Sequence, residues 1–297
     1  MKYAAIAIGS NSTRMLCAQR QDGALTDILR GREETRLFSG LDENGFILPE
    51  RLEETAQAVC RLAQRARAHG AQSIALFATS ATRDARNGEA LARRIQALCG
   101  LQLQVISGDQ EARLAFRAVS QGQRRLVMDI GGGSTEWTLG ENNRVEWAES
   151  MQLGASRLLK KKPILSWQDA QDILQCARDV MAPCAEKLRK HTPAPAMIGL
   201  GGACTTSAAM TLGREAHDEA VEGKTVTAAG AMEQLRLLAS LSMEERLHVP
   251  GLPPSRAAHM PHGLCILIAA LESCGFDQIT VSGRTNLDGY LLSLPEA

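Results

Sequence analysis

Two short segments of the chain repeat one pattern at a fixed separation. Residues 4–16 read AAIAIGSNSTRML and residues 127–139 read VMDIGGGSTEWTL, and aligning Gly9 with Gly131 gives an offset of 122 residues. In each copy an apolar run with strand character leads into a turn of small polar residues. A period this long does not suit a solenoid, whose repeats span about 20–50 residues. It predicts two related domains that face each other across a cleft.

The segments around the repeats alternate between strand and helix patterns. Pro49 and Gly70 bracket a predicted helix at 48–70, and the prolines of 247–256 predict an irregular loop. Further helices are expected at 89–100, 110–122, 166–190 and 257–275, and strands at 3–8, 14–19, 73–79, 101–106, 125–130, 136–140, 143–150, 196–202 and 278–283. We therefore predict an α/β fold with two domains, residues 1–121 and residues 122–297. A closing helix at 286–294 is free to pack back on the first domain.

The charge and composition of the chain argue against several classes of protein. Thirty-three basic and thirty-three acidic residues cancel, and aromatic residues make up only 3% of the sequence. Binding of duplex nucleic acid usually leaves a basic excess and single-strand binding uses stacked aromatics, so neither is expected. The longest apolar stretch, residues 263–271, is too short to span a bilayer, and no signal sequence is recognised. Eight dispersed cysteines without a C-x-x-C pair predict reduced thiols and a cytoplasmic location.

The two repeated turns predict phosphate-binding loops. Glycines let the backbone approach a ligand closely, and consecutive N–H groups together with hydroxyls form an anion-binding nest. An ordinary hairpin turn is the better interpretation of one loop alone, but two copies in register reverse that preference. The predicted phosphate ligands are Gly9, Ser10, Asn11 and Ser12 in the first loop and Gly131, Gly132, Gly133, Ser134 and Thr135 in the second.

Four other residues are candidates for the remaining parts of a phosphoryl-transfer site. Asp129 ends a strand beside the second loop and Glu136 begins the next strand, so both carboxylates could face Mg²⁺ or another divalent cation. Arg83, in ATSATRDARNG, could reach a phosphate with its guanidinium, although a solvated surface arginine fits the local sequence equally well. Glu111 lies in the first turn of a predicted helix, where glutamates are also common for structural reasons.

Five motifs together resemble the exopolyphosphatase and guanosine pentaphosphate phosphohydrolase (Ppx/GppA) family. In chain order they are AIGSNSTRML, ATSATRDARNG, ISGDQEARLAF, LVMDIGGGSTE and QLGASRLL, with weaker matches in GLGGACTTSAAM, VPGLPPSRAAHMPHG and TVSGRTNLDGYLL. The resemblance covers nearly the whole chain and corresponds to the short, two-domain form. It implies the fold shared by actin, Hsp70 and sugar kinases, in which two ribonuclease H-like domains hold the ligand between them.

The resemblance also implies a reaction and roles for these residues. The reaction is release of orthophosphate from the terminal phosphoanhydride of inorganic polyphosphate or guanosine pentaphosphate. Glu111 would be the base that activates water, Mg²⁺ would lie near Asp129 and Glu136, and Arg83 would hold phosphate oxygens together with the two loops. The sequence leaves open the preference between the two substrates and whether the chain forms a homodimer.

The chain departs from the family pattern at several acidic positions. Ala7 stands where the first loop normally begins with Asp, Gln110 replaces the acid before Glu111, Ala258 replaces an Asp, and TNLDG at 285–289 replaces the usual G-L-R-E-G. Loss of one acid from such a site can cost about 10²-fold in rate. The alternative is therefore a catalytically weakened protein that binds polyphosphate or a guanosine polyphosphate in a regulatory role. A small-molecule kinase is the third hypothesis, and the missing adenosine loop counts against it.

Two other clusters have a simpler structural interpretation. His259 and His262 are three residues apart on a predicted helix, but a third metal ligand is missing and structural histidines are the better interpretation. The segment SRLLKKKP at 156–163 could guide a polyanion, and a solvated charged face fits it at least as well.

Overall fold

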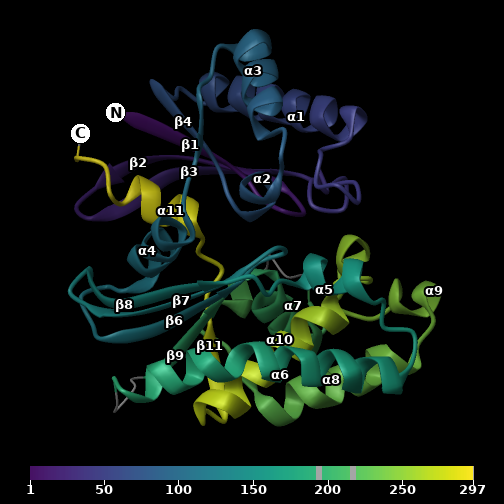
Figure 1. Ribbon diagram of the computed structural model, residues 1–297. Helices are drawn as coiled ribbons and strands as arrows, with labels where there is room; N and C mark the ends of the chain where they lie inside the picture. The colour runs from purple at the N-terminus through teal and green to yellow at the C-terminus, as the bar shows by residue number, and fades with distance from the viewer. Residues whose placement is uncertain (192–195, 215–218, 297) are drawn as a thin grey trace. The chain divides into compact units, whose positions relative to one another are not determined.

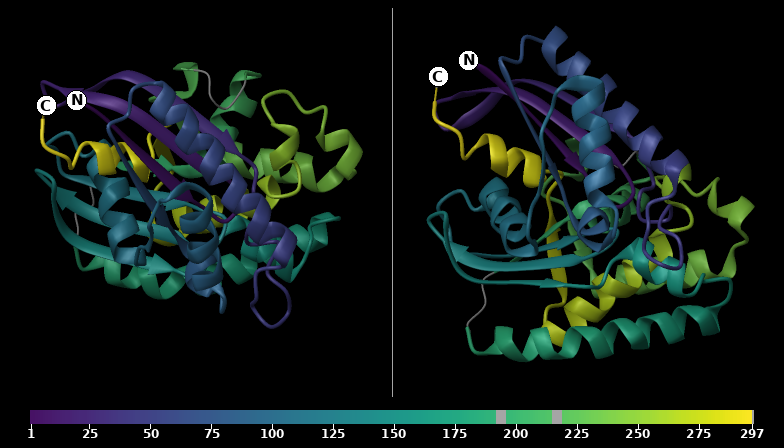
Figure 2. Two further views of the ribbon diagram at one scale, coloured as in Figure 1. Left: turned by 90° about the horizontal axis from the view of Figure 1, so that it is seen from above. Right: turned by 45° about the horizontal axis from the view of Figure 1, so that its top comes forward.

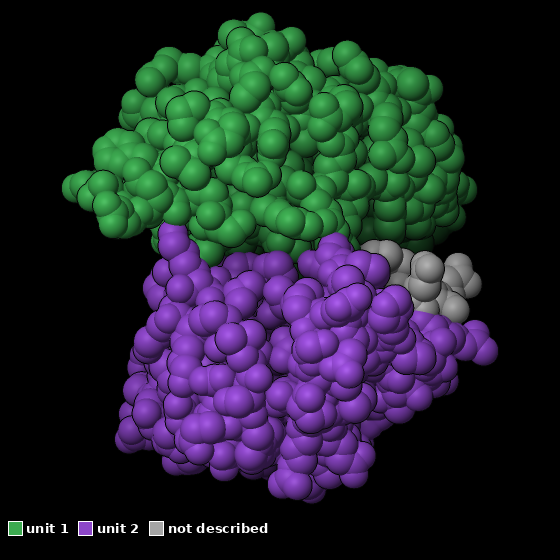
Figure 3. Space-filling view, turned by 90° about the vertical axis from the view of Figure 1, so that its right-hand side faces the viewer, with its two compact units in different colours: residues 1–118, 285–297 green, residues 119–284 purple. Residues whose placement is uncertain are grey.

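The computed structural model describes residues 1–191, 196–214 and 219–296, and it separates into two compact units (Figures 1 and 3). Unit 1 consists of residues 1–118 together with 285–297, and unit 2 consists of residues 119–284. The first unit thus ends three positions before the predicted boundary at residue 121. The segment from residue 285 onward, which the prediction placed in the second domain with the option of packing back, belongs to unit 1. The chain therefore passes between the units twice.

Unit 1 is built on a five-stranded sheet in the order β3-β2-β1-β4-β5. The first three strands are antiparallel neighbours, whereas β4 and β5 run parallel to β1. The strands are β1 (Lys2–Ile8), β2 (Thr13–Gln21), β3 (Ala24–Glu33), β4 (Ser73–Ala78) and β5 (Leu103–Val105), and the helices are α1 (Pro49–Ala68), α2 (Ser80–Asp84), α3 (Gly88–Cys99), α4 (Gly108–Val119) and α11 (Asn286–Leu291). Strand β3 was missed in the sequence because none of its side chains is buried and its apolar residues do not alternate with polar ones.

The alternation of β1 explains how this sheet is covered on both faces. Ala4, Ile6 and Ile8 belong to the core under α1 and α3, while Ala5 and Ala7 pack with residues of α11. Helices α1 and α3 pack side by side over the first of these faces, as Figure 2 shows. Small side chains on the second face let α11 lie close to the sheet, so this C-terminal helix completes the fold of unit 1.

Unit 2 repeats the arrangement with a larger helical layer. Its sheet has the order β10-β11-β9-β6-β7-β8, in which β6, β7 and β8 are antiparallel and β9 runs parallel to β6. The strands are β6 (Arg125–Ile130), β7 (Thr135–Glu141), β8 (Arg144–Met151), β9 (Met197–Leu200), β10 (Thr225–Thr227) and β11 (Gln278–Val281). The helices are α5 (Ala155–Lys161), α6 (Trp167–Arg189), α7 (Gly201–Leu212), α8 (Ala228–Ser240), α9 (Met243–Arg246) and α10 (Met260–Cys274), with 3₁₀ turns at Glu219–Val221 and Pro254–Arg256.

Side chains along β6 again alternate between the two faces of the sheet. Leu126, Met128 and Ile130 belong to the hydrophobic core that includes residues of α6 and α10, whereas Val127 and Asp129 point to the other face. Both units therefore place three antiparallel strands first and parallel strands beside β1 or β6. This is the ribonuclease H-like order, and the predicted α/β fold class is confirmed.

Candidate active site

The first predicted phosphate loop is the turn between β1 and β2. The Gly9 N–H donates to the Ser12 carbonyl across this turn at 3.1 Å. The carbonyls of the two residues between them accept hydrogen bonds of 2.9 Å from the backbone N–H groups of Arg36 and Phe38. Among the residues that the structure describes, the loop N–H groups without a partner are those of Ser10, Asn11 and Ser12.

The second predicted loop, between β6 and β7, has the same construction. The Gly131 N–H donates to the Ser134 carbonyl at 2.9 Å. N–H groups at the beginning of α5, from Ala155 to Arg157, donate to the carbonyls of Gly131 and Gly132 at 2.8–3.1 Å. Over the described ranges of the chain, the N–H groups that remain without a partner are those of Gly132, Gly133 and Ser134.

In both loops the carbonyl groups accept hydrogen bonds, whereas three successive N–H groups have no partner within the described residues. A following segment of the same unit donates hydrogen bonds to these carbonyl oxygens, which would otherwise repel an anion. Successive unpaired N–H groups in a tight turn form an anion-binding concavity. An ordinary hairpin turn does not explain why unrelated segments hold the carbonyls of both loops in the same way.

Gly154 allows α5 to approach the second loop. A Cβ at this position would lie 2.5 Å from the carbonyl carbons of Gly132 and Gly133. The backbone of Gly154 is extended, with φ −144° and ψ 156°, so glycine is needed for space and not for its conformational freedom. The hydroxyl of Thr135, which was predicted as a phosphate ligand, instead donates a hydrogen bond to the Leu153 carbonyl at 2.6 Å. This bond connects the end of the loop to the segment before α5.

Asp129 and Glu136 lie directly opposite each other on β6 and β7. Opposite residues of an antiparallel pair project to the same face of the sheet, with Cβ atoms about 4.5–5.5 Å apart. Glu136 is only 2% exposed and accepts a hydrogen bond of 2.8 Å from Ser150 Oγ. Two carboxylates at this spacing repel each other unless a cation or a proton offsets their charge.

The beginning of α7 lies next to Asp129. Gly201 has φ +84°, and a Cβ there would lie 2.7 Å from Asp129 Oδ1. The segment GLGGACTTS thus forms the turn between β9 and α7, beside the carboxyl end of β6. The buried Arg256 stabilises this turn by donating to the carbonyl of Gly202 at 2.6 Å and to Thr206 Oγ1 at 2.5 Å.

In unit 1 the structure brings Arg83 and Glu111 together. Arg83 Nη1 donates to Glu111 Oε2 and to the Ile106 carbonyl, each at 2.9 Å. Arg83 lies on the short helix α2, and Glu111 lies in the first turn of α4. Arg83 Nη2 is buried and has no hydrogen-bond partner within the described part of the chain. The hydroxyl groups of Ser80 and Thr82 on α2 are likewise buried and have no partner among the described residues. Neither hydroxyl was predicted from the sequence as part of the site.

The order of the parallel strands explains why these groups share one edge of unit 1. The first loop follows β1, α2 follows β4 and α4 follows β5, and the three strands are parallel neighbours. The Thr79 N–H donates to the Ile8 carbonyl at 3.1 Å, which joins the start of α2 to the end of β1. The loop, Arg83 and Glu111 therefore lie at the carboxyl ends of neighbouring strands, where α/β sheets commonly bind ligands.

Two of the departures from the family motifs have a local structural role. Gln110 accepts the Ser107 N–H at 2.9 Å, while the Ser107 hydroxyl accepts the Gln110 N–H at 3.2 Å, which forms a capping box at the start of α4. In TNLDG, Asp288 completes a capping box with Thr285 and receives two hydrogen bonds from Arg30. Ala7, by contrast, is a buried member of the apolar cluster beneath α11.

Within the described residues, His259 and His262 belong to no cluster of possible metal ligands. Burial lowers the pKa of His262 to about 4, and its ring lies between the carbonyls of Ala258 and Lys162. Across the described ranges, no group of three or more His, Cys, Asp or Glu side chains could hold a metal ion.

None of the described helices combines the length and the apolar character that a membrane crossing requires.

The chain is similar in sequence and in structure to known phosphatases. The sequence model of the Ppx/GppA phosphatase family matches residues 16–296. The structure resembles the PPX-GPPA enzyme of Aquifex aeolicus with a TM-score of 0.82 and 28% identity, over 99% of each chain. An exopolyphosphatase from Cytophaga hutchinsonii has the same fold, with a TM-score of 0.88 and 23% identity over 98% of this chain and 96% of that one. An exopolyphosphatase-like protein matches with a TM-score of 0.88 and 25% identity, over 99% of this chain and 98% of that one.

Proposed function

We propose that this chain, which belongs to the Ppx/GppA phosphatase family, releases orthophosphate from the terminal phosphoanhydride of inorganic polyphosphate or guanosine pentaphosphate. The observation that carries the proposal is the shared construction of the two loops, each of which offers an anion three N–H groups without a partner in the described part of the chain. Membership of a phosphatase family, together with the similarity to an exopolyphosphatase-like protein over nearly the whole chain, supports this substrate class.

In this proposal the loop N–H groups and the Ser12 and Ser134 hydroxyls hold the oxygens of the terminal phosphate. Fixed donors of this kind stabilise the charge that develops during phosphoryl transfer without reorganising in the reaction. Glu111 accepts a proton from the attacking water. Arg83 fixes the position of the Glu111 carboxylate through their 2.9 Å contact and keeps one buried N–H for a phosphate oxygen.

The side chains beside the second loop fit a magnesium ion. Asp129 and Glu136 present hard oxygen ligands from the same face of adjacent strands, and a cation would offset the repulsion between them. Mg²⁺ is usually bound by one or two protein carboxylates together with water and substrate phosphate, so the absence of a third acid within the described residues is compatible with it. When bound, the ion would neutralise charge on the terminal phosphate.

The second candidate function is a protein that binds the same ligands with little turnover. Ala7 supports this candidate because no carboxylate stands at the start of the first loop. Gln110 does not support it, since its amide retains the capping contact of α4.

Phosphate release from long-chain polyphosphate and from guanosine pentaphosphate, measured side by side with and without Mg²⁺, tests the proposal. We expect Mg²⁺-dependent release from at least one substrate. Tight calorimetric binding of either compound without release would favour the second candidate, and neither binding nor release would contradict both.

A further inference from the structure

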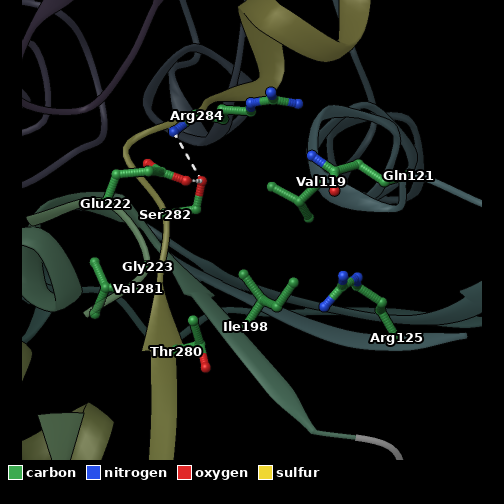
Figure 4. A pocket seen from close by; sticks show the side chains of 10 residues that line it. All are labelled: Val119, Gln121, Arg125, Ile198, Glu222, Gly223, Thr280, Val281, Ser282 and Arg284. Carbon is green, nitrogen blue, oxygen red and sulfur yellow. Dashed lines mark hydrogen bonds between the residues drawn. The ribbon is translucent and has the colours of Figure 1, made fainter. Parts of the chain in front are cut away.

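A separate pocket in unit 2 combines two arginines with an apolar floor (Figure 4). It has a volume of about 150 Å³. All its lining residues, which Figure 4 labels, belong to unit 2. The floor is made by neighbouring strands, because β6, β9 and β11 are adjacent in the sheet.

The guanidinium group of Arg125 lacks a complete set of hydrogen-bond partners among the described residues. Arg125 donates through Nη2 to Gln123 at 2.5 Å, but its buried Nε has no hydrogen-bond partner in the part of the chain that the structure describes. Figure 4 shows the Arg125 guanidinium directed from β6 toward the space beside Val119 and Ile198. A buried guanidinium N–H without a partner costs free energy, which a bound acceptor would recover.

The carboxylate of Glu222, which lines the pocket, already accepts hydrogen bonds from neighbouring residues. Glu222 accepts a hydrogen bond from Ser282 Oγ at 2.8 Å and another from the Gly283 N–H at 2.6 Å. Among the described residues that line the pocket, this carboxylate is therefore held by donors other than Arg125. Guanidinium groups pair best with planar or tetrahedral oxyanions.

The pocket is distinct from the second phosphate loop. Arg125 begins β6, and Asp129 lies four residues later on the same face of that strand. At about 3.3 Å per residue, the two positions are roughly 13 Å apart along the strand. A ligand held by Arg125 is therefore too far away to be the phosphate that the second loop would hold.

We propose that this pocket binds a small phosphate-bearing anion, either orthophosphate or the phosphate group of a small ester. A volume of about 150 Å³ accommodates a phosphate group and a few atoms or waters beside it. Arg125 is the main contact of the anion, and the methyl groups of Ile198 and Val119 form the surface on which the rest of an ester lies.

The location of the pocket suggests what its occupation does to the chain. Val119 and Gln121 follow the passage from unit 1 into unit 2, and Ser282 and Arg284 precede the passage back. A ligand between these segments links them to the sheet and restricts both. We expect slower amide hydrogen exchange at residues 119–121 and 282–284 when the ligand is bound.

Methyl NMR of the full chain tests this proposal, because three isoleucines report on three places. Ile198 lines the pocket, whereas Ile8 and Ile130 precede the two phosphate loops. Orthophosphate and glycerol phosphate are titrated separately into the wild type, Arg125→Gln and a control variant, Arg144→Gln, which alters an exposed arginine at the start of β8.

We expect a saturable shift of the Ile198 methyl signal that Arg125→Gln weakens at least about tenfold and Arg144→Gln leaves unchanged. The probe with the lower dissociation constant identifies free phosphate or an ester as the preferred ligand. No Ile198 shift with either probe, or an equal affinity in Arg125→Gln, would overturn the proposal. Shifts at Ile8 and Ile130 report separately on the loops, and unchanged methyl spectra of the unliganded variants show that they fold.

Discussion

Replacement of Gly154 by alanine tests the construction of the second loop with a single methyl group. The new Cβ would lie 2.5 Å from the carbonyl carbons of Gly132 and Gly133, whereas ordinary contact begins near 3.4 Å. The loop backbone must therefore move by about 1 Å, because neither of these atoms belongs to a flexible side chain. The backbone of Gly154 is extended, so alanine adds no conformational strain of its own.

A displacement of about 1 Å in a group that positions substrate can reduce the rate about 10²-fold. That factor corresponds to about 2.7 kcal/mol in the barrier. We expect Gly154→Ala to lower kcat/KM for phosphate release by about this factor. The global fold should persist, since the methyl group meets a turn and not the hydrophobic core.

The assay measures Mg²⁺-dependent phosphate release together with thermal unfolding. Gly230→Ala is the matched control in the same unit, because this helical glycine meets only a threonine side-chain oxygen at 3.1 Å. We expect the control to keep wild-type activity. Activity of Gly154→Ala within twofold of wild type, at unchanged stability, would refute the claim that the loop depends on its position against α5.

Three further predictions concern stability. Gly289→Ala should lower the free energy of unfolding by about 1–3 kcal/mol in urea titrations, since a Cβ there would lie 2.7 Å from the Leu114 carbonyl carbon on α4; an unchanged midpoint would contradict this. The depressed pKa of His262, about 4, makes the folded state bind fewer protons than the unfolded state between about pH 6.5 and 4, so stability from this group is lost as the pH falls through that window. This loss of stability approaches about 3 kcal/mol below pH 4. The difference in the free energy of unfolding between pH 7 and pH 4 should therefore be smaller in His262→Gln than in the wild type. Equal pH dependence of the two proteins would show that His262 is not the group responsible. Ala7→Asp should destabilise unit 1 by about 1–3 kcal/mol because it places a carboxylate in the apolar cluster beneath α11; a gain in stability would show that Arg14, directly opposite on β2, compensates fully.

The sequence predicted much of this architecture because its strongest signals are local. The repeated strand and turn around Gly9 and Gly131 located both loops, and hydrophobic periodicity located the long helices. Strand β3 escaped prediction because its exposed side chains lack an apolar period. The helix α8 was also missed, and its buried face follows only from packing against α10.

Contacts between distant parts of one unit could not be read from the sequence. Nothing local indicates that Arg36 and Phe38 hold the carbonyls of the first loop, or that α5 does the same for the second. The pairing of Arg83 with Glu111 also depends on the order of β4 and β5 in the sheet. Asp129 and Glu136 were predictable as neighbours because a hairpin of known length fixes their register.

The rate of phosphate release by Glu111→Gln tests the central claim most directly. The amide keeps the shape of the side chain and can still contact Arg83, but it cannot accept a proton from water. With long-chain polyphosphate and Mg²⁺, we predict a loss of kcat of about 10²–10⁴-fold while polyphosphate binding, measured by calorimetry, changes little. Equal rates in the wild type and Glu111→Gln would contradict the role assigned to this carboxylate.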